Sequence, residues 1–440
     1  MPASYANADE PRPGVPFGVA LRIWAKIGFL SFGGPAGQIA LMHGIVVEEK
    51  KWVDEAHFLH ALNYCMLLPG PEAMQLATYL GWLLHGTRGG LAAGLLFVLP
   101  GFVIIAGLSM IYAVFGDAPA VGGLLFGLKA AVVAVVLQAL IKLSRRAVKS
   151  AGAAVIAVAA FVAIAVFNVP FPAIIVLAAL TGFVMARSKP GDGATAGDLA
   201  MERVSKAGTV RVIAIWLAVW LVPVAMLFGF LGRDNVLVQE AVFFSTAAMV
   251  TFGGAYAVLA YVAQQAVDFY GWLQPDEMLT GLGLAETTPG PLILVLVFVG
   301  FLGAWRDPGG LDPVLAGLAG AVTTTWVTFA PCFLWIFAGA PYIERLRSNQ
   351  ALNGAMTAIT AAVVGVIANL ALWFALHVLF GQVETVALGP AAIPMPAISS
   401  FDPAAAMIAA GAAIGLLWMR AGMLTMLGLA AAAGIFLKLF

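Results

Sequence analysis

Apolar runs follow one another almost without pause from residue 18 to the end of the chain. A helix that crosses a bilayer needs about 20 mostly apolar residues. The one substantial hydrophilic connector is the segment 188–210. The first fifteen residues are polar and proline-rich, unlike a signal peptide with its basic start and cleavage site. The pattern predicts an all-α polytopic membrane protein with about thirteen transmembrane helices (6+1+6), at residues 18–46, 57–87, 91–115, 120–143, 151–168, 171–187, 211–231, 238–265, 276–305, 313–340, 351–379, 403–419 and 422–440.

The segments before and after the connector have glycine, proline and tryptophan at matching positions. Residues 29–90 align without a gap to residues 249–310, and 14 of the 62 aligned positions are identical. The identities include Trp52 with Trp272 and a Gly-Gly pair near the end of each segment. We therefore predict an internal duplication, with an N-terminal transmembrane repeat at 1–187, a hydrophilic linker plus connecting helix at 188–237, and a C-terminal transmembrane repeat at 238–440.

The positions of positive charges indicate how the chain enters the membrane. Lys and Arg gather at 142–149 and at 187–211. If residues 57–87 form one broken crossing, both clusters lie on the same side of the membrane as the N-terminus. Because cytoplasmic loops are rich in Lys and Arg, we expect a cytoplasmic N-terminus. The single connecting helix then inverts the second repeat, and inverted-topology repeats are typical of secondary transporters. If residues 57–87 instead form a re-entrant hairpin, the number of crossings before the 142–149 cluster changes by one and that cluster lies outside. That alternative stays open.

The composition agrees with this class. Hydrophobic residues make up 62% of the 440 residues and charged residues 10%, with 22 Lys and Arg against 22 Asp and Glu. Such a chain is neither an ordinary soluble enzyme nor a nucleic-acid binder. Cys65 and Cys332 both lie in apolar stretches, so neither a disulfide framework nor a cysteine metal site is expected. We expect no cofactor and no metal.

Two Pro-Gly-Pro triplets, Pro69-Gly70-Pro71 and Pro289-Gly290-Pro291, interrupt apolar runs. Proline removes a backbone donor and disfavours helix before it, so each run must unwind there. Within a bilayer, unwound backbone survives only when it is buried in protein or lines a wet cavity. The helix that restarts after each triplet presents free N–H groups, which favour anions. Two such starts would form an anion site, and a plain proline kink is the alternative.

Paired glycines precede each triplet, in Phe32-Gly33-Gly34-Pro35 and Phe252-Gly253-Gly254. Adjacent glycines permit either a break in the helix or the close approach of another helix. Both readings stay open, because close approach would also bring these segments against the broken helices.

Ionisable residues inside apolar spans are functional candidates by default. Glu72 and Glu286 flank the triplets, and either would exchange a proton during transport, although Glu72 would also cap its helix. Lys129 would neutralise a divalent anion or extend to the membrane surface. His43 is a third proton-coupling candidate, with an interfacial role as its alternative. Neutral side chains suited to hydrogen bonding with an oxyanion are Gln38, Asn63, Gln75, Thr287 and Thr288.

Residues 32–39, 52–64 and 67–79 resemble the chromate ion transporter family, and residues 251–256 and 287–291 are similar to the second copy of its motif. The match to both halves is typical of the long, two-domain form. The resemblance implies an antiporter of the bacterial inner membrane that exports chromate, driven by the proton motive force, and so confers chromate resistance. It supports positions 33–35 and 69–71 as motif residues without giving them separate roles.

Two other functions stay open at this point. The first is transport or exchange of sulfate or another oxyanion, and the second is an intramembrane enzyme or lipid-handling protein. The absence of a reactive cluster favours a protein that is not an enzyme. The expected partners are a chromate or sulfate-like oxyanion, protons, the lipid bilayer and a second copy in a homodimer, with no nucleic acid.

Overall fold

The computed structural model describes residues 14–116, 118–187, 206–252, 254–340, 350–389 and 391–439. These residues are mostly helical, and the order of elements in the first half is repeated in the second. The first half contains α1 (Phe17–Leu30), α2 (Gly34–His43), the π-helix η1 (Gly44–Glu49), α3 (Glu55–Cys65), α4 (Glu72–Phe115), α5 (Pro119–Ala147), α6 (Ala151–Ala165) and α7 (Phe171–Arg187). After α8 (Lys206–Leu231), the second half contains α9 (Val236–Val250), α10 (Ala255–Gln264), the π-helix η2 (Gln265–Phe269), α11 (Pro275–Thr287), the short η3 (Leu292–Leu294), α12 (Val295–Arg306), α13 (Pro313–Gly339), α15 (Gln350–Leu379), α16 (Pro403–Leu417) and α17 (Met423–Leu439).

Membrane-length helices are present in both halves. Among the described residues, five helices are long and apolar enough to cross a bilayer: α4, α5, α8, α13 and α15. Six further apolar segments, which include α6, α7, α16 and α17, are shorter than 18 residues. The helical membrane class is therefore confirmed. Helix α8 is almost uncovered by other elements of the chain. The preceding linker residues, 188–205, lie outside the described residues.

Residues 57–87 do not form the single broken crossing that we preferred from the sequence. Helix α3 ends at Cys65, and after the first Pro-Gly-Pro α4 runs only to a second turn at His85 and Gly86, where Gly86 has a φ of 60°. Beyond that turn the chain folds back on itself. Gly81 and Gly89 lie in contact, so that a Cβ on Gly81 would overlap the Gly89 carbonyl oxygen. Tyr64 and Tyr79, on either side of the triplet, have ring centroids 5.9 Å apart. Residues 72–84 therefore pack back against the start of the helix that follows, as in the hairpin alternative, and the long apolar helix continues from the turn to Phe115.

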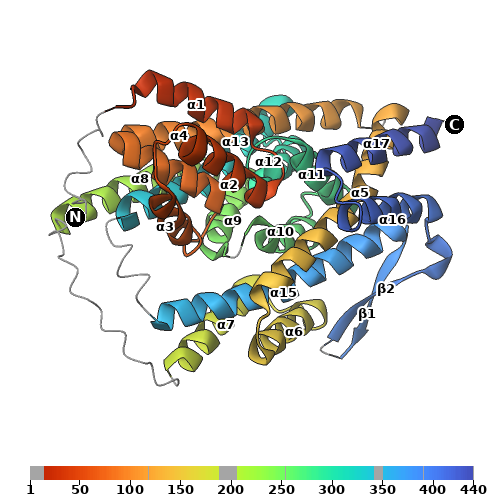
Figure 1. The fold of residues 1–440 in the computed structure, drawn as a ribbon. Helices are drawn as coiled ribbons and strands as arrows, with labels where there is room; N and C mark the ends of the chain where they lie inside the picture. The colour runs from red at the N-terminus through yellow and green to blue at the C-terminus, as the bar shows by residue number, and fades with distance from the viewer. Residues whose placement is uncertain are drawn as a thin grey trace.

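The start of α1 and the end of α17 lie at opposite ends of the molecule (Figure 1). At the proximal end, where α1 begins, the Phe17 ring lies 5.4 Å from the His85 ring and Met66 contacts Arg146 at the end of α5. At the distal end, where α17 ends, Lys438 lies over the Phe126 ring near the start of α5. The end of α4 and the starts of α9 and α11 also lie at the distal end, so α5 runs from distal to proximal.

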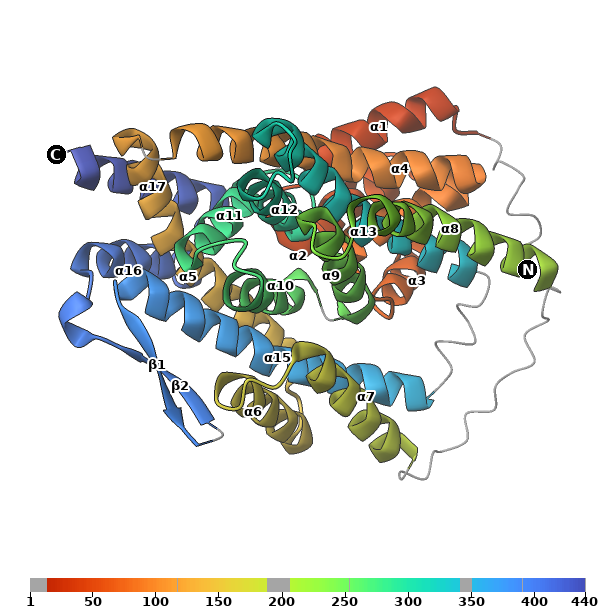
Figure 2. The ribbon, with the colours of Figure 1, turned by 180° about the vertical axis from the view of Figure 1, so that it is seen from behind.

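The two halves exchange their last helices. Helix α5 packs against α16 and α17 of the second half, and α15 packs against α6 and α7 of the first half, as both views of the fold show (Figure 2). Small residues allow this contact: Gly123 of α5 lies against Gly434 of α17, and Gly354 of α15 lies against Gly182 of α7. The duplicated segments are therefore interlocked, and neither forms a separate globule.

A small sheet corrects the all-α expectation. Strands β1 (Val383–Leu388) and β2 (Ala391–Pro396) pair antiparallel, with Val386 opposite Ile393. Their β-branched residues favour strand, and Gly389 supplies a φ of 65° in the turn. The hairpin follows α15 and contacts the α6–α7 loop through the N–H of Ala392, which donates to the Val166 carbonyl.

Candidate functional site

Each Pro-Gly-Pro loop is held by the opposite half of the chain. The Gly70 N–H donates to the Thr251 carbonyl oxygen over 2.8 Å, and the Gly290 N–H donates to the Ser31 carbonyl oxygen over 2.9 Å. Ser31 ends α1 and Thr251 ends α9, both just before the glycine pairs. The four residues occupy equivalent positions at a spacing of 220, so the two hydrogen bonds are related by the repeat. The loops therefore lie together between the two halves.

Two buried glutamines fix the carbonyl groups of these loops. The Gln38 Nε2 donates to the Gly290 carbonyl over 2.6 Å, and the Gln75 Nε2 donates to the Pro69 carbonyl over 2.7 Å. Both side chains are buried. Their amide hydrogens hold protein carbonyls, so in this conformation they are positioning residues and do not face an oxyanion as we expected from the sequence.

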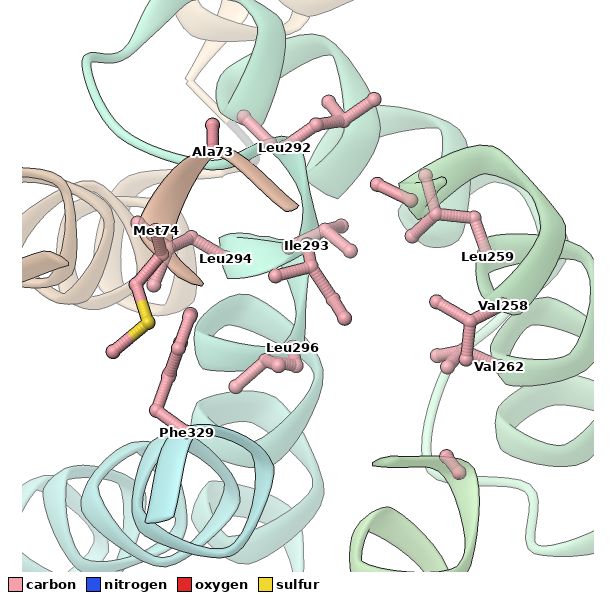
Figure 3. Close-up of a cluster of buried hydrophobic side chains, with 14 of the residues drawn as sticks. Ala73, Met74, Val258, Leu259, Val262, Leu292, Ile293, Leu294, Leu296 and Phe329 are labelled. Carbon is pink, nitrogen blue, oxygen red and sulfur yellow. The ribbon is translucent and has the colours of Figure 1, made fainter. Parts of the chain in front are cut away.

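The two helix starts that follow the triplets lie side by side but differ in character. Helix α4 begins at Glu72 with no other side chain capping its N-terminus. After the second triplet the chain makes the short η3 turn before α12, and its residues Leu292 and Ile293 are buried. Figure 3 shows Ala73 and Met74 of α4 beside Leu292 and Leu294, with Leu259 of α10 across from them. The α4 start therefore carries the polar group, and the second start is apolar.

Two carboxylates lie near the start of α10. A Cβ built on Gly254 would lie 3.8 Å from the Glu72 Oε1, so the Glu72 side chain faces this glycine. Two residues further on, the Tyr256 hydroxyl donates to the Glu286 Oε1 over 2.5 Å. Glu286 is buried, whereas Glu72 is half-buried. The structure thus brings two of the three proton-coupling candidates, Glu72 and Glu286, to one short helix.

The glycine pairs act as breaks. Gly33 and Gly34 have φ values of 85° and 69°, and no atom lies within 4 Å of a Cβ built on either. Pro35 then occupies the first turn of α2. Gly254 likewise has a φ of 102°, whereas Gly253 lies outside the described residues. The positive φ angles, and not close helix packing, explain why glycine is used at these positions.

Several predicted residues do not face the Pro-Gly-Pro loops. Thr287 and Thr288 donate their hydroxyl hydrogens to the carbonyl groups of Leu284 and Ala285 in their own helix. Asn63 is exposed on α3. His43 lies with acidic partners, its Nε2 2.6 Å from Glu55 Oε2.

Lys129 is directed away from the loops as well. Its Nζ donates to Asp276 Oδ2 over 2.9 Å, at the start of α11 and thus at the far end of that helix from the second triplet. We therefore expect Lys129→Ala to change the initial rate of oxyanion uptake into vesicles by less than about fivefold, because exposed ion pairs contribute about 0–1 kcal/mol. Asp276→Ala is the matched control, since it breaks the same pair. A large loss with Lys129→Ala alone would show that Lys129 binds the anion.

The sequence analysis did not predict the residues that connect the two Pro-Gly-Pro loops to the rest of the protein. Ser31 and Thr251 directly precede the two Phe-Gly-Gly motifs, so their matched positions were a usable signal. Tyr256 lies within the second motif but was given no role. Arg146, whose Nη2 contacts the Met66 sulfur beside the first loop, gave no signal because its partner is 80 residues away.

A small cavity lies beside the second Pro-Gly-Pro loop. This cavity between α9, α10 and η3 has a volume of about 10 Å³ and is lined by Thr251, Ile293 and Thr328 among others. This is room for about one water molecule. In the described part of the chain, no group of three His, Cys, Asp or Glu side chains is placed to hold a metal ion.

Comparisons with known proteins identify relatives along most of the chain. The family model described as chromate transporter matches residues 20–183 and 238–435. A probable chromate transport protein of Synechococcus elongatus is 29% identical over 346 residues, which is 78% of this chain and 81% of the relative. The chromate transport protein of Cupriavidus metallidurans is 28% identical over 78% of each chain, and that of Pseudomonas aeruginosa is 29% identical over 83% of this chain and 82% of its own. No solved structure matches the chain.

Proposed function

The chain belongs to the chromate transporter family, and from this premise we propose that it exports chromate from the bacterial cytoplasm, driven by the proton motive force. Membership makes it a transporter and not an enzyme. Export across the inner membrane would lower the internal chromate concentration and so confer resistance. Transport or exchange of sulfate is the alternative, because both ions are tetrahedral dianions with nearly the same hydrogen-bond geometry.

The observation that carries the transport mechanism is the pair of reciprocal hydrogen bonds, Gly70 to Thr251 and Gly290 to Ser31. Each unwound loop is attached to the opposite half, so a movement of one half against the other displaces both loops together. Unwound backbone at the interface of inverted repeats is the usual place for a transporter's substrate site. The one-water cavity means that a dianion requires the loops to separate.

The topology we propose is two inverted repeats with a cytoplasmic N-terminus. The proximal end holds Arg88 after the α4 turn, Arg145 and Arg146 at the end of α5, and Arg187 at the end of α7. Cytoplasmic loops are rich in such residues. The first half begins and ends proximally, α8 crosses to the distal end, and the second half begins there. Segments α1–α2 and residues 72–84 then enter the membrane without crossing it.

Glu72 is the residue we propose to couple anion and proton. Its carboxylate lies at the N-terminus of α4, where the backbone N–H groups favour negative charge. A chromate ion at that position would compete with the carboxylate, so protonation of Glu72 and binding of the anion favour each other. The dianion would then leave together with this proton, and the pair still carries net negative charge outward, the direction that an inside-negative potential favours. The inside-negative potential aids export further, by about 2.3 kcal/mol per charge for each 100 mV.

Uptake of radiolabelled chromate into everted membrane vesicles tests this function. We expect accumulation that requires an imposed proton motive force, and uptake of radiolabelled sulfate, measured in parallel, decides between the two anions. Vesicles from cells that lack the protein are the control. If folded protein in the vesicles accumulates neither anion, the proposed function is wrong; accumulation of sulfate alone would establish the alternative.

A further inference from the structure

Glu240 is a buried carboxyl group that the mechanism above does not use. It lies in the second turn of α9, its side chain is fully buried, and neither Oε1 nor Oε2 has a hydrogen-bond partner in the described residues. An ionised carboxylate without a partner is far more costly to bury than a neutral acid. The equivalent residue of the first half is Ala20, so the repeat does not require a carboxyl group here.

The surroundings of Glu240 form a pocket that fits its carboxyl group. A Cβ built on Gly303 of α12 would lie 2.7 Å from the Glu240 Oε1 and 3.3 Å from the Trp272 ring. The missing side chain of Gly303 therefore makes room for the carboxyl group. Trp272 closes the pocket, and its ring is stacked on Tyr270 with centroids 4.2 Å apart. The walls are otherwise apolar and include Phe244, whose ring stacks on Trp272.

Within the described residues, the helices that pack against α9 place no unpaired charged side chain at this pocket. Helices α10 and α13 contain no charged residue, and the charges of α8 lie in its first two turns, at the opposite end. On α12, Arg306 lies one turn beyond Gly303, but it pairs with Glu277 and donates through Nη1 to the Trp272 carbonyl over 2.8 Å. The Tyr261 and Tyr270 rings both contact Phe243 of α9, so their hydroxyls are further titratable groups on this side of the helix.

The distal surface is close to this carboxyl group. Glu240 is four residues from the start of α9, which corresponds to about 6 Å along the helix axis. The Arg306 side chain is 40% exposed and pairs with Glu277, so a polar contact connects the neighbourhood of the pocket to the distal face. The Tyr112 hydroxyl also donates to Glu277, over 3.2 Å. Arg306, one turn beyond Gly303 on α12, is the cation that we expect to turn toward the carboxylate on deprotonation.

We propose that Glu240 is a proton-binding site that takes up and releases protons at the distal end during transport. The inference rests on the proposed function for its place in the cycle, with the distal end facing outward. The proton moves to and from a Glu240 carboxylate oxygen, and Arg306 stabilises the ionised form. Glu72 remains the group whose carboxylate competes with the anion, so the two carboxyl groups have separate effects.

Two measurements test this proposal. The first is labelling of the reconstituted protein by dicyclohexylcarbodiimide, which reacts with protonated carboxyl groups in apolar surroundings, followed by mass spectrometry. We expect label on Glu240, with a rate that falls as the pH of the distal medium rises. Glu240→Gln removes the site, and exposed Glu384 in β1 is the internal control. Absence of label at every pH would overturn the proposal, whether or not the protein transports chromate.

The second measurement is transport by Glu240→Gln and Glu240→Leu. We expect proton-driven accumulation to fall by about tenfold or more, while chromate binding keeps its dependence on pH because Glu72 is intact. Glu384→Gln should behave as the unaltered chain. Normal gradient-driven accumulation in either Glu240 variant would show that this carboxyl group only fills the pocket. If the unaltered protein is labelled but moves no chromate, the proposed function fails and the proton site stands.

Discussion

Replacing Gly101 by alanine will reduce chromate transport by about tenfold or more, although the change adds only one methyl group. Gly101 of α4 lies directly against the second Pro-Gly-Pro loop, and a Cβ there would overlap the Pro289 carbonyl oxygen. Both groups are buried backbone, so either the loop or the helix must move, and overpacking of this kind costs about 1–3 kcal/mol. The displacement acts on the loop that Ser31 and Gln38 hold. Initial uptake rates, normalised to monodisperse protein in detergent, measure the effect.

Gly107→Ala is the matched control, because it lies on the same helix and no atom lies within 4 Å of a Cβ built there. Alanine is a better helix former than glycine by up to about 1 kcal/mol, so this variant should be at least as stable as the unaltered chain and transport normally. Equal transport by the two variants would mean that the position of the second loop does not limit the rate.

Glu72→Gln will abolish the dependence of chromate binding on pH while leaving the anion able to bind. A glutamine at this position keeps the size of the side chain but carries no charge that competes with the dianion at the α4 N-terminus. Binding across a range of pH, measured on purified protein by displacement of radiolabelled chromate, should therefore be flat. The affinity should equal or exceed that of the unaltered chain at low pH.

Glu286→Gln is the comparison for this experiment. Glu286 is buried and already accepts the Tyr256 hydroxyl hydrogen, so we expect its substitution to keep the pH profile. A flat profile for Glu286→Gln together with a normal profile for Glu72→Gln would reverse the two roles. Normal proton coupling in both variants would remove these carboxylates from the mechanism.

The sequence predicts where the helices are interrupted better than it predicts which residues the interrupted segments contact. The local signals are the Pro-Gly-Pro triplets and the glycine pairs, and the described chain is unwound at each of them. Their common spacing of 220 residues relates the two halves. Residues 57–87 were assigned to one crossing because apolar composition does not distinguish a straight segment from one that returns. The turn at Gly86 is a single residue with positive φ, which is too small a feature to stand out from the surrounding glycines.

The candidate side chains show the same limit. The sequence favours Lys129 as a cation that neutralises a divalent anion or extends to the membrane surface, and it does not reveal the partner Asp276, which is 147 residues away. Gln38 and Gln75 were selected as hydrogen-bond donors, which they are, but their acceptors are protein carbonyls that only the folded chain supplies. Glu240 met the same criterion as Glu72, an ionisable residue inside an apolar span, and was missed because no neighbouring motif drew attention to it.

The exchange of helices between the halves has a consequence for how the protein is made. When α5 leaves the ribosome, α16 and α17 have not yet been synthesised, because α16 begins only at Pro403. The glycine-lined face of α5 must therefore wait in the bilayer, covered by lipid or by an assembly factor, until the end of the chain arrives. Truncation near the C-terminus would then damage the first half as much as the second, and a stalled or shortened chain would present an uncovered α5 to membrane quality control.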